Sequence, residues 1–234
     1  MPISPDNIIY WQWGFISVNA TLVFTWLTMA LLVLGSGWVT RKLTSDVHVS
    51  RWQSALEIVV SVIQQQLKDV TPYQPKGLLP FLGSLFLFIA LSNILAVVPG
   101  FLPPTGSLST TIALAACVFF AVPIYGISRM GGGPYLMNYF RPSVFMMPFN
   151  IIGELSRTLA LAVRLFGNVM SSNIIGAILL IIAPLIFPVI MNLFGLLTGL
   201  VQAYIFTILA AVYIGAAMEI QTTSTTNSKE KIYE

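Results

Sequence analysis

The sequence is short of charge. Only 8% of its 234 residues are Asp, Glu, Lys or Arg, whereas soluble proteins contain about 25%. Hydrophobic residues make up 56% of the chain. This balance excludes a soluble globular domain and predicts an integral membrane protein embedded in the lipid bilayer. We expect no nucleic-acid partner.

The chain has a single cysteine and no recognisable nucleotide-binding motif. The single cysteine, Cys117, can form no disulfide within the chain. The sequence has no glycine-rich phosphate-binding loop, so any nucleotide chemistry must belong to other chains. We therefore expect a non-catalytic chain that holds neither a cofactor nor a metal ion.

The hydrophobic residues occur in runs near the 20 residues that span a bilayer as a helix, and not in the ten-residue alternating strands of a barrel. The fold class that follows is an all-α polytopic membrane protein. It has about five membrane helices and one amphipathic cytoplasmic helix, and it ends in a long, strongly tilted hairpin. We expect one membrane domain, 1–234, composed of an outer N-terminal segment (1–14), a first span (15–39), the amphipathic helix (52–70), a second and third span (78–98 and 110–127), the hairpin (149–218) and a cytoplasmic tail (219–234).

Positive charge predicts the orientation. No Lys or Arg precedes the first span, whereas Arg41 and Lys42 follow it directly, and Arg129 follows the third span. Cytoplasmic flanks carry the excess of Lys and Arg, so the N-terminus is predicted outside and the C-terminus in the cytoplasm.

The terminal hairpin is too long for an upright pair of helices. It stays apolar from Phe149 to Met218 and is interrupted only by Pro184 and Pro188. A helix from 149 to 182 would be about 50 Å long, against a hydrocarbon core of about 30 Å. We therefore expect strongly tilted helices joined at the prolines.

Arg164 lies inside this hairpin, where a guanidinium costs about 2.5–3.5 kcal/mol on insertion scales and so indicates function. Glu154 lies three residues before Arg157, and we expect those two side chains to pair. Glu154 is about 15 Å from Arg164 along a helix, so its carboxylate is too far away to pair with Arg164 as well. Gln202 should reach a similar depth, but an amide cannot neutralise a guanidinium. The sequence therefore predicts that another chain supplies the carboxylate for Arg164.

Two motifs carry a family resemblance. The run from Leu161 to Asn168 (LAVRLFGN) and the run from Gln202 to Thr207 (QAYIFT) resemble the signature of subunit a of F-type rotary ATP synthases. The resemblance implies the membrane stator of the F0 sector, in which two half-channels carry H⁺ to and from a rotating c-ring. It also implies that the carboxylates of the c subunits face Arg164, and that the partners include peripheral-stalk b subunits and the other F0 and F1 subunits. A bacterial inner membrane is the expected location.

The polar residues near the motifs gain expected roles from this resemblance. Asn168, one turn beyond Arg164, and Gln202 would hold the guanidinium or line the ion route. The alternative is that both are polar contacts between helices.

The sequence departs from the family pattern at two positions. Proton-driven relatives often carry Glu or His nine residues after the arginine, and a titratable group seven residues before the glutamine; here these positions are Asn173 and Gly195. Na⁺ needs only hydration and neutral oxygens. Such oxygens are available on Ser171, Ser172, Asn173 and Thr198. H⁺ is the expected ion from the family, and Na⁺ remains the alternative.

Two other classes of function stay open. A secondary transporter would be expected to show an internal repeat around broken helices, and we find none. A structural subunit that conducts no ions would make Arg164 a buried structural cation.

Overall fold

The structure is a computed structural model that describes residues 9–13, 16–40, 51–70, 77–98, 100–130, 133, 146–182 and 187–230. Five of its helices are long and apolar enough to cross a membrane, which confirms the all-α polytopic class. The helices are α1 (Ala20–Thr40), α2 (Arg51–Val70), α3 (Leu78–Leu95), α4 (Leu108–Met130), α6 (Met146–Ile182) and α7 (Phe187–Glu230), with a short 3₁₀ helix, η2 (Pro104–Gly106). The charged flank at Arg41 and Lys42 and the hairpin turn at Pro184 lie outside the described residues.

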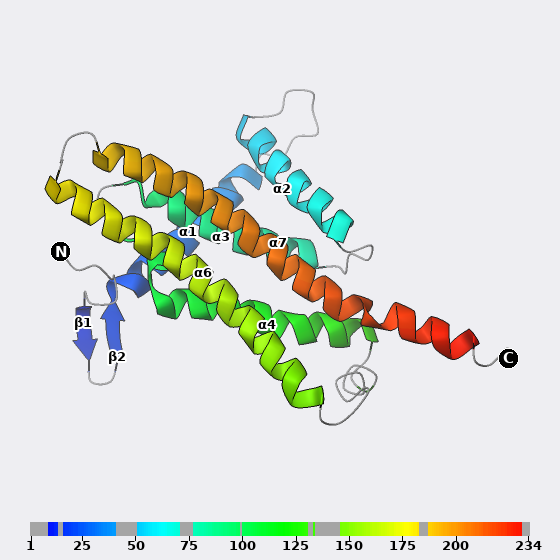
Figure 1. The fold of residues 1–234 in the computed structure, drawn as a ribbon. Helices are drawn as coiled ribbons and strands as arrows, with labels where there is room; N and C mark the ends of the chain where they lie inside the picture. The colour runs from blue at the N-terminus through cyan, green and yellow to red at the C-terminus, as the bar shows by residue number, and fades with distance from the viewer. Residues whose placement is uncertain are drawn as a thin grey trace.

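The terminal hairpin is formed by α6 and α7, with 37 and 44 residues. At 1.5 Å per residue these helices are about 56 and 66 Å long. Figure 1 shows them side by side, crossing the other helices obliquely. Helix α7 continues past Met218 to Glu230, so most of the segment expected as a tail is helical.

The N-terminal segment differs from the expectation. Strands β1 (Ile9–Trp13) and β2 (Ile16–Asn19) pair antiparallel, and α1 begins at Ala20 instead of residue 15. Both strands are rich in β-branched and aromatic residues that favour extended backbone. The first residues of this apolar run are compatible with either a helix or a short strand, so the sequence alone does not distinguish the two structures.

Helix α2 is amphipathic. Ile63 and Leu67 are buried where α2 packs against α3 and α7, whereas the polar residues Ser61, Gln65 and Lys68 on the other side are exposed. The predicted amphipathic helix is thus present over almost the predicted range, and it lies beside the membrane helices as a separate element (Figure 1).

The core lies where α3, α4, α6 and α7 meet. Leu161 and Leu165 of α6 and Phe206 of α7 are almost completely buried there. Alanines on α7 let the helices approach closely, as is usual in membranes: Ala203, Ala210, Ala211 and Ala217. Hydroxyl groups in the helices donate to carbonyls one turn earlier, as Thr207 does to Ala203 O, because a bilayer offers no water to satisfy them.

One end of the bundle, here called the η2 end, gathers several chain segments around η2. The ring of Phe24, near the start of α1, lies edge-on to Phe101 at 4.9 Å. Gly106 approaches α6 so closely that a Cβ there would lie 3.4 Å from Val169 Cγ1 and 3.5 Å from Asn173 Nδ2. The end of α3 and the starts of α1 and α4 therefore lie at the same end of the bundle as the second half of α6.

A close contact joins α3 to α7. Asn93 of α3 is 5% exposed, and its Nδ2 donates to the carbonyl oxygen of Gly199 at 3.0 Å. A Cβ at position 199 would lie 2.7 Å from Asn93 Cγ and 2.9 Å from Asn93 Cβ. Only glycine at this position lets the Asn93 side chain lie against the α7 backbone.

We expect Gly199→Ala to destabilise the fold by about 1–3 kcal/mol, because the new methyl group overlaps a buried side chain. The measurement is the midpoint of thermal unfolding in detergent. Gly176→Ala on α6 is the matched control, since a Cβ there meets nothing within 4 Å. Equal midpoints for the two variants would contradict the proposed packing.

Candidate functional site

Arg164 lies midway along α6, on the exposed side of the helix. Its neighbours on that side include Val163 and Leu159, which are 58% and 48% exposed. Within the described part of the chain, no hydrogen bond or ion pair reaches the Arg164 guanidinium. The arginine is thus presented on an apolar outer surface without a partner from the described residues.

The buried side of α6 fixes the position of Arg164. Leu161 and Leu165 flank the arginine in sequence and are 1% and 0% exposed. Because these two leucines are held in the core, rotation of α6 about its axis would expose them. The packing therefore keeps Arg164 turned outward.

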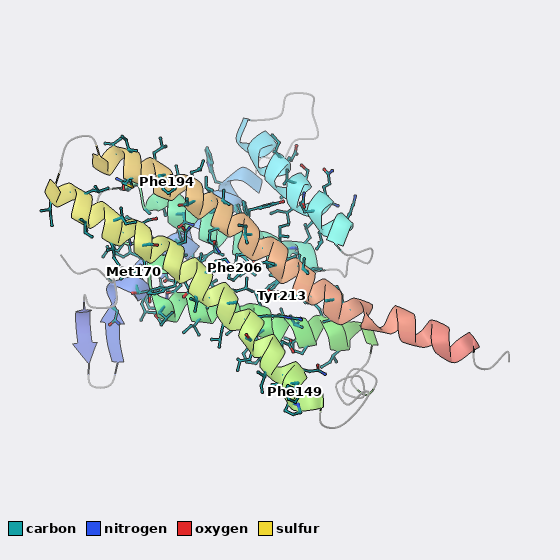
Figure 2. The ribbon with its side chains drawn as sticks, in the orientation of Figure 1. Phe149, Met170, Phe194, Phe206 and Tyr213 are labelled. Carbon is teal, nitrogen blue, oxygen red and sulfur yellow. The ribbon has the colours of Figure 1, made fainter. Side chains whose placement is uncertain are left out.

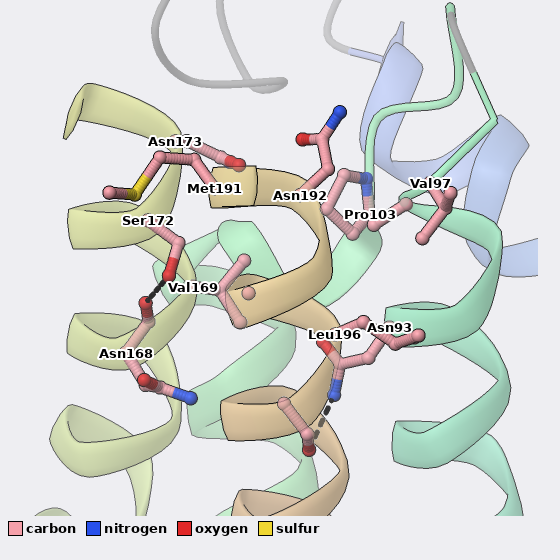
Figure 3. Close-up of a pocket in the computed structure, with 13 residues that line it drawn as sticks. Asn93, Val97, Pro103, Asn168, Val169, Ser172, Asn173, Met191, Asn192 and Leu196 are labelled. Carbon is pink, nitrogen blue, oxygen red and sulfur yellow. Dashed lines mark hydrogen bonds between the residues drawn. The ribbon is translucent and has the colours of Figure 1, made fainter. Parts of the chain in front are cut away.

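A pocket of about 60 Å³ lies at the η2 end between α3, α6 and α7 (Figure 3). This space exceeds the roughly 10–15 Å³ that a single water needs, so the pocket can hold water. Its polar lining is uncharged and comes from three helices: Asn93 of α3, Asn168, Ser172 and Asn173 of α6, and Asn192 of α7. The apolar lining includes Val97, Val169 and Leu196.

The pocket extends toward the two motifs. Asn168 lies four residues after Arg164, about 6 Å along the helix. On α7, Gly199 lines the pocket and lies three residues before Gln202. The inner end of the pocket is therefore about one helical turn from both Arg164 and Gln202.

Gln202 is buried, with 6% of its surface exposed. Its Nε2 has no hydrogen-bond partner among the described residues, and no bond there joins Gln202 to Arg164. The Gln202 amide is thus buried in the isolated chain, whereas the Arg164 side chain is exposed. A contact between Gln202 and Arg164 stays a prediction.

The remaining predicted site residues occupy distinct places. Arg157 Cζ lies 5.9 Å from the ring centroid of Tyr213 on α7, a cation–π contact that ties α6 to α7. Glu154 is half-buried, and its backbone oxygen accepts a hydrogen bond from Thr158 Oγ1; its pairing with Arg157 stays a prediction. Ser171 is exposed and donates to Gly167 O, outside the pocket lining.

Asn93 and Asn192 were not among the predicted site residues, yet both line the pocket. Asn93 was recognisable as a polar residue in an otherwise apolar span, which is a functional signal in a membrane helix. Its neighbours on α6 and α7 could not be found from sequence, because they lie about 75 and 100 residues further along the chain.

The pocket presents neutral oxygens. Among the described residues that line it, none is Asp, Glu or His. In the described part of the chain, no three His, Cys, Asp or Glu side chains gather as a metal site. The chemistry available is thus hydration and weak coordination in the pocket, beside a fixed positive charge.

Comparison with known proteins identifies the family. Residues 22–215 match the model of the ATP synthase A chain. The chain is 60% identical over 217 residues to ATP synthase subunit a of Albidiferax ferrireducens, covering 93% of this chain and 94% of the relative. It is 57% identical over 220 residues to ATP synthase subunit a 2 of Acaryochloris marina, covering 94% of each. The motifs around Arg164 and Gln202 were thus correctly interpreted, and the chain belongs to the ATP synthase A chain family, the membrane stator subunits of the F0 sector.

Proposed function

We propose that the pocket at the η2 end is part of the outer half-channel and that Arg164 faces the carboxylates of the rotating c-ring. The observation that carries this proposal is the position of the pocket, which ends one helical turn from an exposed arginine without a partner in the described residues. An ion leaving the pocket would meet the ring next to that arginine.

The fixed positive charge of Arg164 would release the ion that each ring carboxylate carries. The guanidinium stays protonated at any working pH, so it favours the ionised form of an approaching carboxylate and expels the ion bound there. At about 4 Å and an effective dielectric constant of about 20, the attraction is about 4 kcal/mol. The same charge repels a cation that would otherwise pass between the half-channels without turning the ring.

The orientation follows from the charge pattern. The loop with Arg41 and Lys42 would be cytoplasmic, which puts α2 on that side and the η2 end outside. The N-terminus is then outside and the C-terminus inside, in a bacterial inner membrane. Peripheral-stalk b subunits and the other F0 and F1 subunits would complete the complex.

The coupling ion is H⁺ by family expectation. Na⁺ is the second candidate, and the lining of the pocket favours it. Asn173 lines the pocket where relatives often carry a titratable group, and the other polar residues around it are also neutral. A neutral, hydrated pocket can pass Na⁺ without any group that changes protonation.

Arg164→Ala should abolish coupled ATP synthesis, because the ring carboxylates lose the charge that expels their ions. The measurement is ATP synthesis by the whole complex in liposomes driven by an ion gradient. Gly176→Ala on the same helix is the control for a change on α6 away from the motifs. Coupled synthesis retained by an assembled Arg164→Ala complex would exclude the proposed role and favour a structural subunit.

Gln202→Leu separates stability from transport. Replacing a buried amide that has no hydrogen-bond partner in the described residues by an apolar group of similar size should leave the thermal midpoint unchanged or raise it. Coupled transport should fall at the same time if the amide assists Arg164. A lower midpoint with normal transport would instead indicate a purely structural amide.

The ion can be identified on the ring. Dicyclohexylcarbodiimide labels the protonated carboxyl groups of the c subunits, so bound Na⁺ should slow labelling at neutral to alkaline pH if Na⁺ is the coupling ion. The measurement is the labelling rate of the whole complex with and without Na⁺, with K⁺ as the control salt. A rate that Na⁺ does not change would establish H⁺.

A further inference from the structure

We propose that the pocket contains a cation site in which Asn93 Oδ1 and Ser172 Oγ act only as hydrogen-bond acceptors, and that this site binds partly hydrated Na⁺ on its way to the ring. The inference rests on the proposed function with its second candidate, Na⁺, as the coupling ion, because it assigns a Na⁺-binding step to the outer half-channel. It adds two ligands, one from α3 and one from α6.

The hydrogen bond to α7 determines which atom Asn93 presents. An oxygen cannot donate to a carbonyl, so the group that faces Gly199 O at 3.0 Å must be the amide nitrogen. Asn93 Oδ1 is then directed away from this bond, and it has no hydrogen-bond partner among the described residues. Figure 3 shows the bond and the amide beside the pocket. Asn93 therefore offers the pocket an acceptor.

Packing holds this orientation. Asn93 is 95% buried and lies against the bare backbone of Gly199, within the space that a Cβ would occupy. A half-turn of the amide would bring two oxygens together at that carbonyl. The side chain is consequently preorganised, so binding of an ion would not require the free energy of reorienting the amide.

Ser172 is restricted in a similar way. Its hydroxyl donates to Asn168 O at 3.0 Å, one turn earlier on α6, as the dashed line in Figure 3 marks. A serine hydroxyl has a single proton, so only lone pairs remain for the pocket. Two walls of the pocket thus present acceptor oxygens. The Ser172 proton and one of the two Asn93 amide protons are engaged by backbone carbonyls.

Acceptors in a neutral pocket suit a monovalent cation. Oxygen dipoles can replace part of the hydration shell of Na⁺, and about 60 Å³ leaves room for some of its waters. The amides of Asn168 and Asn173 also line the space and can turn an oxygen toward the ion. Because none of the described lining residues is a carboxylate, binding stays weak enough for release to the ring.

The test uses Asn93→Leu and Ser172→Ala in the whole complex in liposomes, with Na⁺ supplied on the outer side at fixed pH. Each change removes one oxygen ligand and keeps approximately the side-chain size. The outer Na⁺ concentration for half-maximal ATP synthesis should rise about tenfold in Asn93→Leu and severalfold in Ser172→Ala. Protection of the ring by Na⁺ against dicyclohexylcarbodiimide should not change, because the ring site is intact.

Gly176→Ala is the control, since position 176 lies on α6 outside the pocket. A half-maximal Na⁺ concentration that is unchanged in both variants would overturn the site. Synthesis by the wild type that is independent of Na⁺ would also overturn it, and would indicate hydronium or a proton carried by water. If Asn93→Leu does not assemble, Ser172→Ala decides alone. The stator role itself fails only if Arg164→Ala retains coupled synthesis, so the two failures are distinguishable.

Discussion

The cost of placing one guanidinium inside a bilayer is the constraint on which the rest of this structure depends. Such a charge is retained only where it has a task and a partner. The chain holds one side of α6 in the core through Leu161 and Leu165, so that Arg164 stays on the outside of the bundle. No described residue neutralises this charge, as the proposed pairing with a carboxylate of another chain requires.

The hairpin and the pocket are connected by this same geometry. Helices α6 and α7 are longer than a membrane is thick, so they cross the other helices obliquely (Figure 2). Close packing at Gly199 and Asn93 holds α7 against α3, while beyond that contact the helices leave a small polar space. That space ends about one helical turn from Arg164, so the proposed ion route combines a lining whose described residues are not titratable with a fixed positive charge.

Neutral polar groups in this protein are ordered by backbone carbonyls. Ser172, Thr198 and Thr207 donate to carbonyls of their own helices, and Asn93 donates to the backbone of a neighbouring one. In a medium without water, each such bond removes an unsatisfied donor. It also determines which lone pairs face a cavity, so the same bonds that satisfy the polar groups determine what the pocket presents to a ligand.

The sequence by itself determined the class, the number of spans and the long hairpin, because hydrophobic run length is a property of composition and order. It also singled out Arg164 as a candidate site residue, because a charge within an apolar segment is costly in a bilayer. It missed the two strands before α1, since a short apolar run fits either structure. It also could not assemble the pocket. Asn93, Ser172 and Gly199 are far apart in the chain, and only tertiary packing brings their donors and acceptors together.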